Sequence, residues 1–134
     1  MDRLHLIAPD LVPLLAAASR DQRRRSAYAV ARWVVEHVEH LPAEIVVGLD
    51  GSPPSQLNQI AERLDDDYLS LQEQVEAGDR SNDGVTAAFS RARAAHCVAL
   101  AASGEASECI YEAVAATDNL AGVRTVVLKS FNAA

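Results

Sequence analysis

The stretch that decides the fold is residues 54–77, PSQLNQIAERLDDDYLSLQEQVEA. Its apolar residues recur every three or four positions, which is the spacing of one face of an α-helix. Prolines at its start suit a first helical turn, and Gly78 after it suits a helix end. The sequence therefore predicts one long amphipathic helix. Its apolar face consists of Leu57, Ile60, Ala61, Leu64, Tyr68, Leu71 and Val75.

The other faces of this helix carry the densest negative charge in the chain. Consecutive aspartates fan around a helix instead of converging on one cation, so we expect no magnesium site there. The carboxylates form either the solvated face of an amphipathic helix or a negative surface for a basic partner. Under the second reading, the predicted partner-binding residues are Glu62, Asp65, Asp66, Asp67, Glu73 and Glu76.

Helical spacing extends to both sides of this segment. The run at residues 41–49 fits a strand or a buried helical turn, and we expect a helix because a lone strand would have no partner. Asn, Asp and Ser at residues 81–83 are expected to cap the next helix, and Asp118 the last. The other predicted helices cover residues 9–18, 21–40, 81–103, 105–117 and the segment after 118.

These segments predict an all-α fold, with residues 1–134 forming a single domain. We expect a compact bundle of about six helices joined by short turns, with stacked helical hairpins as an alternative arrangement. The length suits one domain with one core. Aromatic residues make up only 4% of the chain and alanine is abundant, so the helices should approach one another closely.

The charge balance restricts the partners. Nineteen acidic and twelve basic residues give a net charge of -7, which disfavours binding to nucleic acid or to anionic membranes. No apolar run reaches the length of a membrane helix, and the first residues do not resemble a signal peptide, so a cytoplasmic location is expected. One cluster of positive charge stands out in this acidic chain, and we expect it to form ion pairs with the acidic helices. It consists of Arg20, Arg23, Arg24 and Arg25.

Histidines and cysteines offer the remaining candidates for chemistry. His37 and His40 have a spacing that suits two metal ligands, but no third ligand cluster accompanies them, so no metal and no cofactor is expected. His96 and Cys97 are helix neighbours, which point about 100 degrees apart and cannot readily form a catalytic pair. Cys97 and Cys109 are expected to stay free as small buried hydrophobes.

No phosphate-binding loop, nucleophile elbow or paired-cysteine motif is present, so the chain is not expected to be an enzyme and no catalytic residue is predicted. An alternative is a small helical enzyme or ligand-binding domain. Its site would lie between helices near His96, Cys97 and Tyr111.

Two alanine-rich segments, FSRARAAH at residues 89–96 and EASECIYEAV at residues 105–114, follow the acidic helix. In composition and helix order the chain resembles the small all-α immunity proteins of bacterial polymorphic-toxin and contact-dependent inhibition systems. The resemblance implies a cytoplasmic, non-enzymatic protein that binds one cognate toxin and blocks its active site. An acidic face would suit a basic nuclease toxin. The resemblance transfers no residue role, and the oligomeric state stays open.

Overall fold

The computed structural model describes residues 3–78, 81–82 and 84–132, which contain α-helices, one short 3-10 helix and no strand. This confirms the predicted all-α class. The described residues form eight α-helices, where about six were expected. The helix expected at residues 41–49 is the single turn α4 followed by η1, and α1 is a single turn that was not predicted. The elements are α1 (Leu4–Ile7), α2 (Leu11–Ala17), α3 (Arg20–His37), α4 (Ala43–Val46), η1 (Gly48–Asp50), α5 (Pro54–Glu76), α6 (Val85–Ala102), α7 (Ala106–Thr117) and α8 (Leu120–Asn132).

Several helix ends differ from the prediction. α3 ends at His37, and His40, expected to be helical, has a φ of 63°, a left-handed conformation that reverses the chain. At the start of α8, the Asn119 side chain accepts a hydrogen bond from Gly122 N, while Asp118 has a φ of 49° in the preceding turn. Asp83 lies outside the described residues, and α6 is preceded directly by Gly84.

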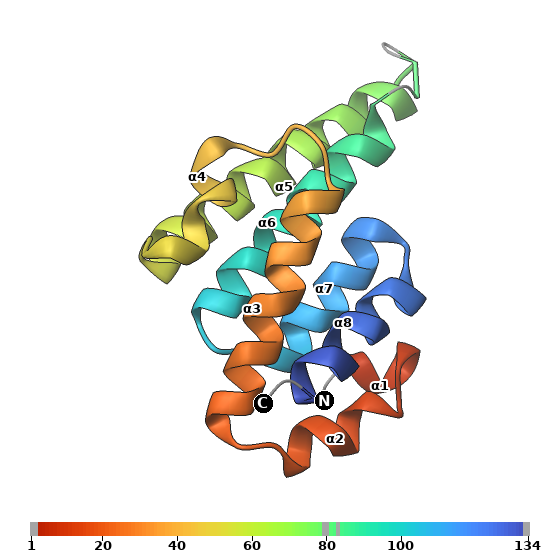
Figure 1. The fold of residues 1–134 in the computed structure, drawn as a ribbon. Helices are drawn as coiled ribbons and strands as arrows, with labels where there is room; N and C mark the ends of the chain where they lie inside the picture. The colour runs from red at the N-terminus through yellow and green to blue at the C-terminus, as the bar shows by residue number, and fades with distance from the viewer. Residues whose placement is uncertain (1–2, 79–80, 83, 133–134) are drawn as a thin grey trace.

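Helix α6 occupies the middle of the bundle (Figure 1). It packs against α5 on one side and α7 on another, and α3 crosses both α6 and α7 before contacting α8. Because neighbours surround α6, its second half is buried on more than one face. Small side chains permit that close approach. The buried residues of this half are Ala94, Ala95, Cys97, Val98, Ala99 and Ala101.

The α5–α6 hairpin extends beyond the other helices, toward the upper right in Figure 1. The predicted apolar face of α5 is fully covered only near its beginning, at Leu57, Ile60 and Ala61. From Leu64 onward the same face is half-buried, because α6 alone packs against it. The opposite face of α5 is exposed to solvent. None of the described helices is long and apolar enough to cross a membrane.

Candidate functional site

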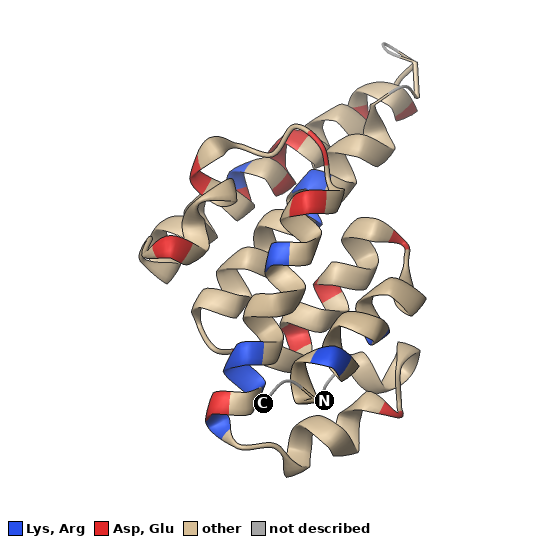
Figure 2. Ribbon diagram, in the orientation of Figure 1, with Lys and Arg blue, Asp and Glu red and all other residues tan. Residues whose placement is uncertain are grey.

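A stripe of carboxylates runs along the outer face of α5. Glu62, Asp66, Leu69, Glu73 and Glu76 follow at alternating steps of four and three residues, which places them along one side of a helix. All five side chains are exposed, and Leu69 at the centre is 51% exposed. We call the four carboxylates around Leu69 the acidic stripe. Figure 2 shows several acidic residues of α5 as red segments of its ribbon.

The acidic stripe is not neutralised within the molecule. Among the described residues, no Lys, Arg or His nitrogen lies within 4.0 Å of any of its four carboxylates. Glu62 and Asp66 stand four residues apart, a like-charge spacing that costs a helix about 0.2–0.5 kcal/mol. The stripe therefore presents unbalanced negative charge around one exposed apolar side chain, which is a surface suited to a basic protein partner.

Asp65 does not belong to this surface. Its carboxylate accepts a hydrogen bond from Arg93 Nη2, and its Oδ2 lies 2.6 Å from His96 Nε2. The side chain is 29% exposed. Burial alone would raise the pKa of Asp65, but the hydrogen bonds from Arg93 and His96 outweigh it and hold the pKa below its usual value. Of the six predicted binding residues, Asp65 is thus committed to contacts with α6, whereas Asp67 is exposed beside the stripe.

The Asp65 contact is one end of a polar network that the sequence did not predict. Arg93 Nη1 donates to both carboxylate oxygens of Glu112, at 3.2 and 3.1 Å, and Glu112 is only 4% exposed. Arg3 Nη2 donates to Glu112 at 3.0 Å and also contacts Glu108. The network joins α5, α6 and α7 to the segment before α1. Its only trace in the sequence is the pair of arginines in α6 and the pair of glutamates in α7, both in alanine-rich helices.

The three residues of the alternative site are not brought together. His96 faces Asp65 on α5, whereas Tyr111 lies beneath the Arg3 guanidinium, whose carbon is 4.1 Å from the ring centre. Cys97 Sγ lies in the core, 3.5 Å from Cys109 Sγ across the α6–α7 hairpin. That shared hydrogen bond, together with burial, raises the pKa of the Cys97 thiol well above its usual range. A thiol in this setting lacks the activation that a nucleophile needs.

His37 at the end of α3 and His40 on the loop after it contact different groups. His37 Nδ1 lies 2.7 Å from the carbonyl oxygen of Trp33, while His40 Nε2 lies 3.9 Å from Glu39. In the part of the chain that the structure describes, no group of three His, Cys, Asp or Glu side chains is placed to hold a metal ion.

The arginines at the beginning of α3 differ from expectation. Arg23 Nη1 donates to the carbonyl oxygen of Ala18 at 2.6 Å, which secures the turn before the helix. The ion pairs expected between these arginines and the acidic helices are absent from the described residues. Arg20, Arg23 and Arg24 instead line a hollow beside Ala102 at the end of α6, and Figure 2 shows the basic residues at the beginning of α3 in blue.

Comparison with known proteins does not assign this chain to a family. No protein-family model matches this chain, and neither the curated proteins nor the solved structures contain a significant match.

Proposed function

We propose that this protein is a cytoplasmic, non-enzymatic immunity protein that binds and neutralises a cognate bacterial toxin through the acidic stripe of α5. The observation that carries the proposal is the unbalanced charge of Glu62, Asp66, Glu73 and Glu76 around the exposed Leu69. A few buried residues carry most of the affinity of a protein interface, and complementary charge around them speeds association. Leu69 is the anchor of this arrangement.

The proposed partner is a basic toxin, and a nuclease fits best. A nuclease cleft is positively charged because its substrate is a polyanion. A row of carboxylates along a rigid helix resembles such a substrate in charge and in linear extent. The proposal needs no catalytic group on this chain, which agrees with the separate placement of His96, Cys97 and Tyr111.

Co-expression with the neighbouring gene product tests the proposal. We expect the neighbour to arrest growth when expressed alone and to be harmless in the presence of this chain, with both proteins purifying as a complex. A neighbour that is harmless alone and shows no binding would contradict the immunity function.

The binding face is tested by two variants that change the net charge equally. The triple variant Glu62→Gln, Asp66→Asn and Glu73→Gln should slow association, lower its salt dependence and reduce protection. The matched control replaces three exposed carboxylates on other elements, Glu36, Glu44 and Glu105, by Gln. Equal loss in the two variants would show that only overall charge matters, not the stripe. Leu69→Asp should chiefly speed dissociation, because it removes the apolar anchor.

A further inference from the structure

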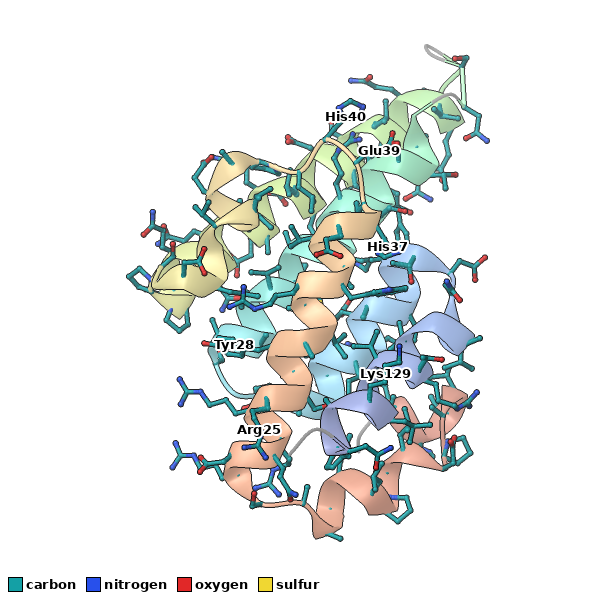
Figure 3. The ribbon with its side chains drawn as sticks, in the orientation of Figure 1. Arg25, Tyr28, His37, Glu39, His40 and Lys129 are labelled. Atoms are coloured by element: carbon teal, nitrogen blue, oxygen red, sulfur yellow. The ribbon has the colours of Figure 1, made fainter. Side chains whose placement is uncertain are left out.

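A cleft of about 380 Å³ lies between the end of α3 and the facing parts of α6 and α7. None of the stripe residues lines it. Its size falls in the range of small-molecule sites, and its wall combines aromatic, cationic and hydroxyl groups. Figure 3 shows His37 on the side of α3 that faces α7, with Glu39 and His40 on the loop beyond it. The lining residues that matter here are Trp33, His37, Ser90, Arg91, Thr117 and Asn119.

Arg91 gives the cleft an unbalanced positive charge. It is half-buried, and in the described part of the chain no carboxylate lies within 4.0 Å of its guanidinium. Glu39, which also lines the cleft, has a side chain that is 91% exposed and pairs with His40 instead. A guanidinium in a cleft whose acidic residue does not pair with it is available to an anion, which it can bind with two parallel hydrogen bonds.

The aromatic wall of the cleft is fixed in place. The rings of Trp33 and His37 stack with centres 4.3 Å apart, and His37 Nδ1 is held at 2.7 Å by the Trp33 carbonyl oxygen. Behind the wall, Gly122 permits close approach of α8. A Cβ atom at Gly122 would lie 2.8 Å from Trp33 Cζ2 and 2.7 Å from Asn119 Nδ2. A wall fixed in this way loses little freedom when a ligand binds.

A second, more apolar hollow of about 500 Å³ adjoins the cleft. Ser90, Ala116 and Thr117 line both, so the two hollows meet along α6 and α7. The second hollow is lined by the apolar side chains of Ile7, Phe89, Tyr111 and Val114. A largely apolar hollow therefore continues directly from the cleft that contains Arg91.

We propose that this cleft binds a small carboxylate with an apolar body. The carboxylate binds Arg91, and the body packs against the Trp33–His37 wall and extends toward Phe89. A single negative charge is favoured over a phosphate dianion, because Arg91 is the one permanent cation lining the cleft in a protein of net charge -7. The site is independent of the toxin-binding proposal, since neither uses a residue of the other.

Trp33 is the only tryptophan of the chain, so its fluorescence reports on this cleft alone. We would titrate the protein with 3-phenylpropionate and, as a neutral isostere, 3-phenylpropionamide. The carboxylate should produce a saturable change in Trp33 emission, and the amide should bind at least about tenfold more weakly.

Substitutions of Arg91 then identify the anion receptor. Arg91→Gln should weaken binding of 3-phenylpropionate by about tenfold or more, and Arg91→Lys by less, because it keeps the charge and loses the planar fork. Arg63→Gln is the matched control, since Arg63 is an exposed arginine of α5 that also lacks a carboxylate partner among the described residues. It should bind like the unaltered protein. Thermal unfolding verifies that each variant is folded.

Each of four results would overturn the proposal. Equal binding of the amide and the carboxylate would leave only an apolar cleft, as would an unchanged affinity in Arg91→Gln. Tighter binding of phenyl phosphate than of 3-phenylpropionate would assign the cleft to a doubly charged ligand. No saturable change at concentrations well above a millimolar would show that no such site exists. Toxin protection by Arg91→Gln is measured separately and should be unaffected.

Discussion

One nitrogen of Arg93 on α6 donates to both carboxylate oxygens of Glu112 on α7, at 3.2 and 3.1 Å. The other terminal nitrogen donates to Asp65 on α5, so a single guanidinium ties three helices together. Glu112 also accepts a hydrogen bond from Arg3 Nη2 at 3.0 Å. The carboxylate is almost fully buried and contacts two guanidinium groups, which makes it the central charge of the network.

Removal of the Glu112 carboxylate should destabilise the fold strongly. We predict that Glu112→Ala lowers the free energy of unfolding by about 3–5 kcal/mol, because Arg93 and Arg3 both lose a buried carboxylate and Arg93 keeps only Asp65 as a partner among the described residues. Urea unfolding measures the loss. Glu73→Gln, on the exposed stripe, is the control and should change stability by about 0.5 kcal/mol or less. A loss of similar size in both variants would show that the network contributes nothing special.

Asp65 should make stability depend on pH in the acidic range. Its pKa is lower in the folded protein than its ordinary value of about 3.9, so folding favours the ionised carboxylate. That contribution is complete above the ordinary pKa and is lost as the pH falls through the folded value. The difference in unfolding free energy between the unaltered protein and Asp65→Asn should therefore be constant at neutral pH and shrink below about pH 4.

The exposed neighbour Asp67 provides the charge-matched comparison for Asp65. Asp67→Asn removes the same charge from the same helix without removing a contact to Arg93 or His96. A stability difference for Asp65→Asn that stays unchanged from about pH 5 down to about pH 2 would contradict the role assigned to these contacts.

The two thiols should be inert in the folded protein. Cys97 and Cys109 are both fully buried, and the pKa of Cys97 is raised, so little reactive thiolate is present at neutral pH. We predict that a chromogenic disulfide reagent labels both cysteines only as fast as the protein opens, and that labelling becomes immediate in denaturant. Rapid labelling of either cysteine in the native protein would show that the α6–α7 interface opens readily.

Gly122 should be intolerant of even one added methyl group. An alanine there would gain about 1 kcal/mol of helix propensity, but its Cβ would meet Trp33 Cζ2 at 2.8 Å. We predict that Gly122→Ala is destabilised despite that gain and shifts Trp33 emission, as the indole is pushed from its stack with His37. Ala121→Gly, one residue earlier on the exposed side of α8, should lower stability without shifting the emission. A stabilised Gly122→Ala with unchanged emission would contradict the close approach.

The predicted bounds of α5 were close to the observed ones, because they follow from residues that are near one another in the sequence. The structure begins the helix at Pro54 and ends it at Glu76, where apolar spacing and terminal residues predicted residues 54–77. The end of α3 was placed too late, at about residue 40, because the apolar spacing continues through Val38. α3 ends where the backbone of Val38 becomes extended, and His40 then adopts a left-handed conformation; sequence spacing gives no indication of either change.

The candidate binding residues also divide into those that sequence spacing placed correctly and one that only the packing of helices could place. The spacing of Glu62, Asp66, Glu73 and Glu76 was sufficient to place them on the outer side of an amphipathic helix. Asp65 has the same chemistry and adjoins Asp66, yet it faces α6. Its partners Arg93 and His96 lie 28 and 31 residues further along the chain, so only the packing of α5 on α6 could reveal them.

By itself, the sequence determined that this protein is helical, where its longest amphipathic helix lies and that its charge is strongly negative. These properties follow from the period of apolar residues and from composition, which do not depend on the arrangement of helices in space. Tertiary structure alone decided which charges are balanced internally, through Arg93 and Glu112, and which stay free on α5 and at Arg91. Charge balance depends on distances between helices, and a linear sequence does not contain those distances.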